Sequence, residues 1–453
     1  MSSIAEAIAL AAPTFTGQLL QPTDHAYDER RRVHNGLIDK RPAVIASCRG
    51  IADVVDAVQL AHTLGLEVSV RGGGHNVAGR ATIDKGLMID LSPMKGIYVD
   101  PPGCTVRAQG GVLWRELNRE TQLHGLATTG GVVGSTGIAG LTLGGGLGWL
   151  MPKYGLALDN LQAADMVMAD GGVVRASPAE NPDLFWAIRG GGGNFGIAAS
   201  LEYSLHQVGP MVTGGVVAHP LTRAFDVLRF FRDTCASLPD EAMLVAGLQA
   251  APDGSNAKLV GLVGGHCGSL EQGAAVFRPL KTFGPPVLDM MGPMPYTALN
   301  GMLDPAFPKA AFNYWKAQFL TDLSDDAIRT LIAGFQACPS PMSHVIIEHF
   351  HGAASRVPVT ATACATRVTG FNVVIASQWM GSDETERGIA WARETFASLT
   401  PYLAPTRYLN YLEDDALDPA AVAYGPNLPR LRAIKKKYDP ENVFRHNVNI
   451  LPK

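Results

Sequence analysis

Between residues 42 and 70, the spacing of apolar residues changes from continuous to helical and back. The apolar run at 44–46 is typical of a buried strand, and apolar residues then recur at helical spacing through 51–61. A second apolar-rich run follows at 67–70. The pattern therefore predicts a strand, a helix and a strand in succession.

Short apolar runs continue this pattern as far as residue 208. We expect a helix over 112–120, followed by a glycine-dense loop, and a hairpin turn at Asp170-Gly171. The runs that predict short strands are 87–91, 97–99, 104–109, 162–169 and 172–175. Residues 20–208 are therefore expected to form one α+β unit.

Beyond Pro210 the apolar residues alternate with polar ones over longer stretches, as in an antiparallel sheet. Helical spacing returns at 327–336 and at 385–398. The stretches that predict strands of this sheet are 213–218, 243–248 and 258–263. The second half of the chain is thus expected to form a separate sheet domain.

Composition narrows the class of protein. The chain has 453 residues, 47% of them hydrophobic, and a formal net charge of -4, so it can bury a large core and offers no basic field for nucleic acid or an anionic membrane. The six cysteines form no Cys-x-x-Cys pair, and no metal-ligand cluster is evident, so we expect neither a metal site nor disulfides. The N-terminus lacks the pattern of a signal peptide. We expect a cytoplasmic monomer or homodimer.

Glycine is concentrated in places that suggest a ligand. The segment 71–76, Arg-Gly-Gly-Gly-His-Asn, follows a predicted strand, and its flexible backbone can turn amide groups toward a pyrophosphate. On the residues alone, a tight turn with an incidental histidine fits equally well.

Two further segments are glycine-rich. Residues 130–148 are too long for a hairpin turn, and their small side chains leave room for a bulky planar group. Residues 186–196 contain the spacing G-x-G-x-x-G, but 182–188 reads as a helix where a Rossmann site requires a strand. We therefore reject a Rossmann site.

Taken in order, these segments resemble the FAD-binding domain of the vanillyl-alcohol oxidase and p-cresol methylhydroxylase (PCMH) superfamily, specifically the berberine bridge enzyme-like FAD-linked oxidases. The resemblance spans about residues 40–208 and resumes at 345–453, where 438–445, Tyr-Asp-Pro-Glu-Asn-Val-Phe-Arg, is similar to a family signature. Several motifs in the same order are more specific than any one of them.

The resemblance implies an α+β fold with a two-part FAD-binding domain of the PCMH type and an inserted antiparallel-sheet substrate domain, here called the cap. Residues 1–208 would form the FAD-binding domain, with its PCMH-type core at about 37–208. Residues 209–400 would form the cap, and residues 401–453 would pack back on the FAD-binding domain.

In the family, the histidine of this glycine motif is bonded to the 8α-methyl group of the flavin, and it corresponds here to His75. Many members carry a second link through a cysteine, whose place Val133 takes, and no cysteine lies between Cys104 and Cys235. We therefore expect FAD held by a single covalent link through His75. The other residues expected to bind FAD are Arg71, Gly72, Gly73, Gly74, Asn76, Val133, Gly134, Thr136, Gly137, Gly140, Thr142, Gly145, Gly148, Gly196, Ile197, Asn410, Asn447 and Asn449.

Tyr408 is the first candidate for the proton acceptor. Its motif resembles the Y-x-N motif of the family, in which the tyrosine adjoins substrate and the asparagine, here Asn410, contacts the flavin. The period of two in a strand would place both side chains on one face. A phenol with an ordinary pKa of about 10 needs electrostatic help to act as a base.

Glu348 is the second candidate. In the predicted strand 344–351 it shares a face with His344, and His349 lies on the opposite face. The family position that sometimes holds an acidic or amide base is the apolar Val374 here, or a neighbour of Val374.

Residues outside the flavin loops are assigned mainly structural roles. Arg367 resembles the arginine of a family A-H-R pattern, and we expect it to form an ion pair or hydrogen bonds between domains. Tyr314, Trp315 and Lys316 are candidates for the cap side of the pocket, although aromatic residues at such spacing more often belong to a core.

The leading hypothesis is an FAD-dependent oxidoreductase that moves a hydride from a small organic substrate, an alcohol, sugar, amine or phenolic metabolite, to flavin N5. Dioxygen would reoxidise the flavin. The alternatives are a flavin dehydrogenase that uses another electron acceptor, and a redox-silent or lyase-type flavoprotein on the same scaffold.

Overall fold

The strand, helix and strand expected at residues 42–70 form part of the first sheet. The computed structural model describes residues 4–413 and 418–453, and the order of strands in this sheet is β1-β2-β4-β3, with β2, β4 and β3 parallel. The helix α3 (Ile51–Leu64) buries its apolar stripe against the sheet. The strands are β1 (Gln18–Leu20), β2 (Val44–Ser47), β3 (Val68–Arg71) and β4 (Leu87–Asp90).

The second sheet of the N-terminal half is antiparallel, with the order β5-β6-β10-β8-β9. Between β6 and β8 the chain forms α4 (Trp114–Thr121) and the glycine-rich segment. The strands are β5 (Ile97–Asp100), β6 (Thr105–Gln109), β8 (Leu161–Val167), β9 (Val173–Ala176) and β10 (Ile197–Ser204). A short sheet pairs β7 (Leu126–Ala127) with β11 (His206–Gln207).

The cap is one large antiparallel sheet of order β15-β12-β14-β13-β18-β19-β17, with β16 also paired to β12. Its strands are β12 (Met211–Pro220), β13 (Ala242–Ala250), β14 (Lys258–His266), β15 (Leu288–Asp289), β16 (Gly292–Pro295), β17 (Phe312–Phe319), β18 (His344–Phe350) and β19 (Gly370–Trp379). The predicted α+β fold with a PCMH-type FAD-binding domain and an antiparallel sheet is therefore confirmed.

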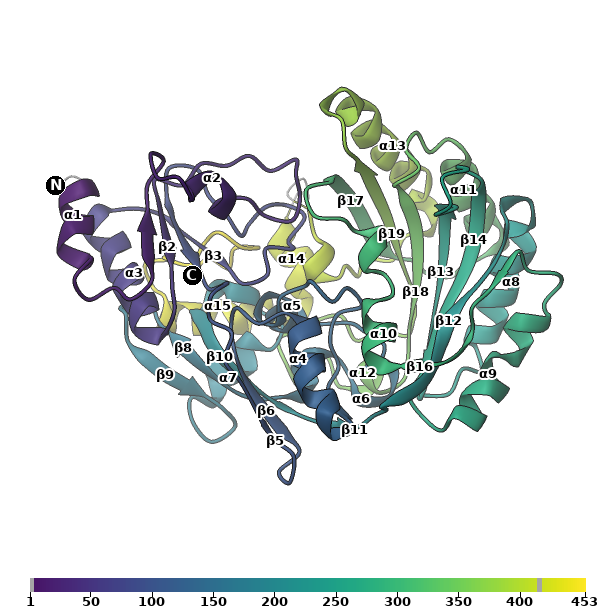
Figure 1. Cartoon of the computed structure of the whole chain (residues 1–453), viewed down its shortest axis with the longest axis horizontal. Coiled ribbons are helices and arrows are strands. Elements are labelled where there is room, and N and C mark those ends of the chain that lie inside the picture. The colour runs from purple at the N-terminus through teal and green to yellow at the C-terminus, as the bar shows by residue number, and fades with distance from the viewer. Residues whose placement is uncertain (1–3, 414–417) are drawn as a thin grey trace.

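Helices cover the outer face of the cap sheet, away from the FAD-binding domain (Figure 1). Phe231, Leu331 and Trp391 from three of these helices are buried against strand residues such as Leu262 and Ile347. Because side chains alternate along a strand, the other face of each strand points toward the N-terminal half. The helices are α8 (Ala224–Cys235), α9 (Leu270–Thr282), α11 (Asp325–Gln336) and α13 (Thr385–Ser398).

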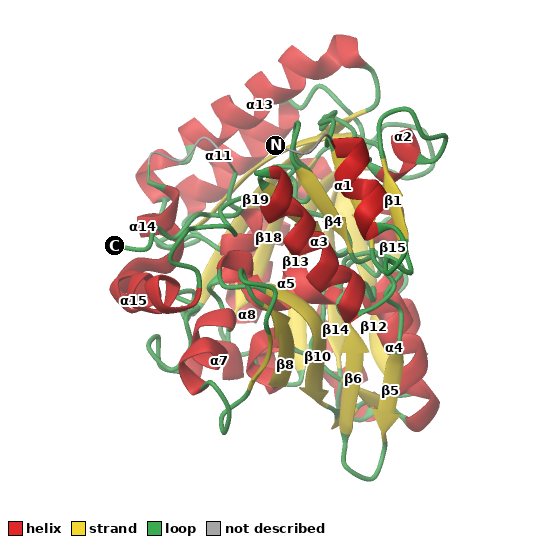
Figure 2. Ribbon diagram, turned by 90° about the vertical axis from the view of Figure 1, so that its left-hand side faces the viewer, coloured by secondary structure: helices red, strands yellow, loops and turns green. Residues whose placement is uncertain are grey.

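The C-terminal helices lie beside the first half of the chain, although they are far from it in sequence. α15 (Leu428–Tyr438) packs beside α7 (Pro182–Ile188), as Figure 2 shows, and α14 (Pro419–Tyr424) precedes it. Leu431 and Trp186 belong to the same buried cluster. The final segment thus supplies part of the core under the antiparallel sheet.

Two segments differ from the sequence-based expectation. Part of the expected glycine-dense loop is a helix, α5 (Ile138–Gly144). Asn410 packs closely against this helix: a Cβ on Gly144 would lie only 2.0 Å from Oδ1 of Asn410. The expected strand at Tyr408–Tyr411 is instead a 3-10 turn at Leu409–Tyr411, closed by a hydrogen bond from the amide of Tyr411 to the carbonyl of Tyr408.

Residues 4–413 and 418–453 include no helix that is long and apolar enough to cross a membrane. That part of the chain also contains no group of three or more His, Cys, Asp and Glu side chains arranged to hold a metal ion. The six cysteines are unbridged.

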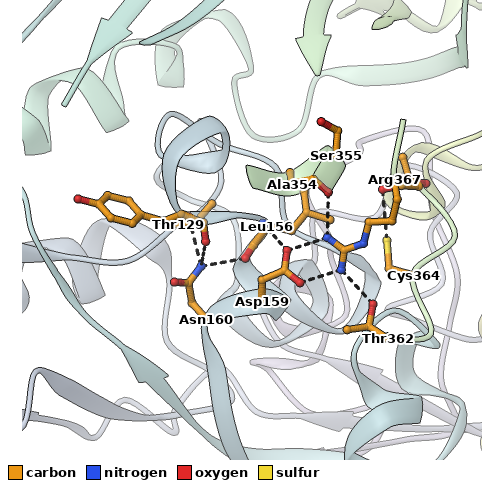
Figure 3. Close-up of polar contacts among 12 residues, drawn as sticks. Thr129, Leu156, Asp159, Asn160, Ala354, Ser355, Thr362, Cys364 and Arg367 are labelled. Carbon is orange, nitrogen blue, oxygen red and sulfur yellow. Dashed lines mark hydrogen bonds and ion pairs between the residues drawn. The ribbon is translucent and has the colours of Figure 1, made fainter. Parts of the chain in front are cut away.

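Arg367 joins the two halves of the molecule, as its ion-pairing role predicted. Its guanidinium donates to both carboxylate oxygens of Asp159 at 2.7 Å, and also to the carbonyl of Ala354 and the hydroxyl of Thr362 (Figure 3). Its side chain is 2% exposed and that of Asp159 is 13% exposed. This bidentate pair fixes the segment after α12 (Ala353–Arg356) against the FAD-binding half.

Replacing Asp159 with asparagine is expected to destabilise the protein by about 3 kcal/mol, because it leaves the buried Arg367 guanidinium without a countercharge. Denaturant unfolding followed by tryptophan fluorescence measures the change. Asp240→Asn breaks the exposed pair with Arg356 and serves as the matched control, which should shift the transition little. Equal shifts for both variants would contradict the role assigned to the buried pair.

Candidate active site

A deep cavity lies where the glycine-rich segments meet the inner face of the cap sheet. Its free volume is about 2100 Å³, including the open mouth. Its wall is built from the glycine-rich segments, the C-terminal segment and the inner face of the cap sheet, so a molecule bound in it would contact both halves of the protein.

Most of the predicted FAD residues line this cavity. They come from the loop after β3, the segment before and within α5, the start of β10, and the C-terminal segment. Those on the wall are Gly72, Gly73, Gly74, His75, Asn76, Val133, Thr136, Gly137, Gly140, Gly196, Ile197, Asn410 and Asn447.

Arg71 does not lie on the wall. Its guanidinium is bound to the buried carboxylate of Asp90 at 2.9 and 2.6 Å, and it also donates to the carbonyls of Arg30 and Arg32. Through these contacts Arg71 anchors the strand that carries the glycine motif, and a direct contact of Arg71 with FAD stays a prediction.

Five other predicted FAD residues also lie off the wall, namely Gly134, Thr142, Gly145, Gly148 and Asn449. The amide of Gly134 donates to Asp304, and the hydroxyl of Thr142 pairs with Tyr203 inside the core. At Gly145 and Gly148 a side chain would clash with other protein atoms: a Cβ on Gly148 would lie 1.7 Å from the carbonyl oxygen of Gly130. Asn449 lies two residues beyond Asn447, past the wall.

His75 is held in a defined orientation at the cavity wall. Its Nε2 lies 2.9 Å from the hydroxyl of Ser135, and its ring stacks on His34 with centroids 3.9 Å apart. Burial lowers the pKa of His75 to about 3 and that of His34 to about 4. Both imidazoles are therefore neutral at pH 7, so one nitrogen of His75 keeps a free lone pair.

The wall fits FAD by its shape and by its free polar groups. Gly73 and Gly137 bring two backbone segments together so closely that a Cβ on either would lie 2.3 Å from the other's amide nitrogen. The hydroxyl of Ser69, which lines the cavity, is buried without a hydrogen-bond partner among the described residues. A bound polar cofactor would satisfy such a group.

Tyr408 and Asn410 meet beside the cavity even though they do not form a strand. The phenol oxygen of Tyr408 accepts from the amides of Gly146 at 2.7 Å and Leu147 at 3.1 Å, and from Nδ2 of Asn410 at 3.0 Å. Burial raises the pKa of Tyr408, although each of these three hydrogen bonds lowers it. Because its oxygen is already surrounded by protein donors, this arrangement favours an anchoring role for Tyr408.

Glu348 faces the cavity from β18 and is bound by two uncharged groups. Tyr411 donates to its Oε1 at 2.9 Å, and Asn372, directly opposite on β19, donates to its Oε2 at 2.8 Å. Burial raises the pKa of Glu348 to about 7, although both hydrogen bonds lower it. The pKa of Tyr411 is also raised, mainly by burial. Such a carboxyl group can take up and release a proton near neutral pH.

Tyr411 was missed in the sequence analysis because a strand would turn it away from Tyr408. In a 3-10 turn, side chains three residues apart share a face. The ring centroids of Tyr408 and Tyr411 are accordingly 5.1 Å apart, and both residues line the cavity. A tyrosine three residues after the Y-x-N tyrosine was the available signal.

The cap side of the cavity is otherwise apolar. Within the described part of the cap, Glu348 is the one acidic or basic residue on the wall. Trp315, one of the three candidates for the cap side of the pocket, lies on the cavity wall. Tyr314 instead accepts a hydrogen bond from Arg393, and Lys316 donates one to Glu413. The other cap residues on the wall are Met243, Val245, Leu303, Phe307, Ile346 and Val374.

Two known family models match the segments that form this site. The model of the FAD binding domain family matches residues 42–177, which include the His75 motif and α5. The berberine and berberine-like model matches residues 407–451, which include Tyr408, Tyr411 and Asn447.

The whole chain is similar to (R)-6-hydroxynicotine oxidase of Paenarthrobacter nicotinovorans, with 32% identity over 98% of both chains. The chain is a berberine bridge enzyme-like FAD-linked oxidoreductase. An FAD-linked oxidoreductase of Dictyostelium discoideum is 30% identical over 91% of this chain and 89% of its own. The cofactor of this berberine bridge enzyme-like protein is FAD.

Solved structures place the fold in the same group. The crystal structure of 6-hydroxy-D-nicotine oxidase from Arthrobacter nicotinovorans is 30% identical, covers 97% of this chain and 99% of its own, and has a TM-score of 0.90. A glucooligosaccharide oxidase from Acremonium strictum, at 24% identity and a TM-score of 0.88 over 100% of both chains, shares the fold. This berberine bridge enzyme-like oxidoreductase thus shares its fold with both solved oxidases, and a shared fold does not by itself fix the substrate.

Proposed function

We propose that the chain is an oxidase that carries FAD on a single covalent link to His75 and removes a hydride from a small apolar amine. The observation that carries the proposal is the pair of Glu348 and Tyr411, set in a cavity whose cap wall is otherwise apolar. When bound, FAD supplies the two-electron acceptor at its N5 atom, and dioxygen reoxidises it.

The single link is supported by the residues around the cavity. His75 presents a neutral imidazole at the wall, whereas Val133, the residue at the place of the family's second attachment, lines the same cavity with an unreactive side chain. The first cysteine before Val133 in the sequence is Cys104, and the first one after it is Cys235.

Glu348 and Tyr411 are proposed to receive the proton that the substrate loses. Tyr411 takes the proton on its phenol oxygen while its own proton passes to Glu348 Oε1, 2.9 Å away. This route avoids a free phenolate, which burial disfavours. Asn372 holds the second carboxylate oxygen and is a positioning residue.

The apolar cap wall favours an apolar substrate. A sugar needs hydrogen-bond partners for many hydroxyl groups, and side chains such as Met243, Val245 and Ile346 provide none. Glu348 has uncharged partners, so a protonated amine would supply the countercharge that its ionised form needs in this buried site. The (R)-6-hydroxynicotine oxidase relative is named after a compound that is also an amine.

Anaerobic mixing of the purified holoprotein with matched compounds tests the proposal. Apolar cyclic amines are expected to bleach the flavin absorbance, whereas the corresponding cyclic alcohols and oligosaccharides are not, and air should restore the colour with formation of hydrogen peroxide. Bleaching by sugars alone would overturn the substrate class. Recovery with an artificial acceptor but not with air would make the protein a dehydrogenase, and an unbleached flavin throughout would contradict the proposed function.

A further inference from the structure

Ser135 contacts His75 from outside the cofactor cavity. Its hydroxyl lies 2.9 Å from Nε2 of His75, yet Ser135 is absent from the cavity wall, which Val133, two residues before it, and Thr136, the next residue, both line. The hydroxyl of Thr136 is 3.5 Å from the other ring nitrogen, Nδ1, at the limit of a hydrogen bond. The two nitrogens of His75 are therefore not equivalent.

Ser135 is held in place by residues of the cap. Asp304 accepts a hydrogen bond of 2.6 Å from the amide of Gly134, the residue before Ser135. Asn300, on α10 (Tyr296–Gly301), donates from Nδ2 to the carbonyl of Gly131 at 2.8 Å. The loop that carries the Ser135 hydroxyl is thus fixed by side chains from the other half of the molecule.

His34 restrains the face of the His75 ring. The two rings stack with an interplanar angle of 21°, and the backbone of His34 is bonded on both sides, to Gly74 and to Ala310. Rotation of the His75 ring would break both this stack and the contact with Ser135. The imidazole is consequently fixed in plane and in rotation.

We propose that Ser135 is the positioning residue for attachment of FAD. In the proposed arrangement its hydroxyl accepts a hydrogen bond from a protonated Nε2 of His75, which leaves the lone pair on Nδ1, the nitrogen beside Thr136 of the cavity wall, to form the bond to the 8α-methyl group. The inference rests on the proposed covalent link through His75. The residue acts through His75 and touches neither the flavin nor the substrate.

The role of Ser135 follows from the protons that must leave when FAD becomes attached to His75. A C–H bond of the methyl group breaks and a bond from Nδ1 to that carbon forms, and the carbon gives up two electrons to the ring system of the same FAD. One proton leaves the methyl carbon and one leaves Nε2 of His75, and both reach the reduced flavin. Dioxygen then takes the two electrons and two protons as hydrogen peroxide. Because Nε2 must be protonated at the start and release its proton at the end, an acceptor at 2.9 Å serves both stages.

The test measures covalent incorporation of FAD by intact mass, in protein produced under riboflavin limitation and then incubated with FAD. Ser135→Ala is expected to slow incorporation by roughly tenfold to a hundredfold, the scale on which partners that orient a reactive imidazole act. Ser135→Thr keeps the hydroxyl and should restore the rate. NMR of the isolated flavin peptide should show attachment at Nδ1 alone in the wild type and the threonine variant, and loss of that selectivity in any product of the alanine variant.

The outcomes separate the two levels of the proposal. Wild-type protein that gains no mass from FAD would refute the covalent link itself. A wild type that gains one FAD, with Ser135→Ala doing so at the same rate and on Nδ1 alone, would overturn the role of Ser135 and leave the link intact. A slow alanine variant that Ser135→Thr does not rescue would also contradict the role, since loss of loop packing would then explain the effect. Thermal unfolding of the apoproteins checks that the variants are folded.

Discussion

Replacing His75 with alanine is expected to abolish the covalent attachment of FAD completely. The wild type should gain the mass of one FAD per chain and keep its yellow colour in the pellet after acid precipitation. The variant should show no added mass and release its colour to the supernatant. It should still bind some FAD, because the glycine segments around Gly73, Gly137 and Gly193 also line the cavity.

Turnover of the His75→Ala variant should also fall, because the attached imidazole draws electron density from the flavin and favours hydride acceptance. His62→Ala is the matched control: this histidine is exposed and bonded to the carbonyl of Ala169, so flavin attachment should be unaffected. A flavin found on a cysteine peptide of the wild type would show that the position assigned to Val133 is wrong. If the His75→Ala variant, whose flavin is not covalently attached, turned over as fast as the wild type, the proposed electronic effect of the attached imidazole would be contradicted.

The sequence predicted the location of the flavin cavity better than its wall. The motif at 71–76 and the run at 130–148 both border the cavity, because glycine marks places where the backbone is approached closely. The sequence does not say what approaches. At Gly145 it is the Tyr408 ring, 2.7 Å from a Cβ placed there, rather than a cofactor. A composition signal therefore cannot distinguish a ligand contact from packing of the protein against itself.

The catalytic side depended on contacts between distant segments. Alternation in 344–351 separates Glu348 from His349 but does not say which face points into the pocket; in the structure, Glu348 on β18 lines the cavity. Its partners Tyr411 and Asn372 lie 63 and 24 residues away in sequence, and no local pattern brings them to it. The choice between Tyr408 and Tyr411 also depended on whether a short segment turns with a period of two or three residues.

Replacing Tyr411 with phenylalanine is expected to slow flavin reduction by about a hundredfold or more, the usual scale for loss of a general base. Glu348→Gln should have a similar effect, since the amide cannot take the proton that Tyr411 passes on. FAD attachment should persist in both, because neither residue contacts His75. Anaerobic stopped-flow measurement of flavin reduction gives these rates directly.

The pH dependence separates the two residues further. The pKa of Glu348 is raised to about 7, and only its ionised form accepts a proton, so the reduction rate should rise with pH through about 7 and then level off. Glu348→Gln should remove this inflection. Since the two side chains act as one unit, the double variant should be no slower than the slower single variant.

Tyr408→Phe is the discriminating comparison. It removes a phenol oxygen that accepts from Gly146, Leu147 and Asn410, so it should weaken the turn after α5 and slow flavin reduction much less than Tyr411→Phe does. If instead Tyr408→Phe is the slow variant and Tyr411→Phe reduces its flavin at the wild-type rate, the three donors stabilise a phenolate on Tyr408. The proton would then be taken by that residue, and the pair of Glu348 and Tyr411 would serve only to bind the substrate.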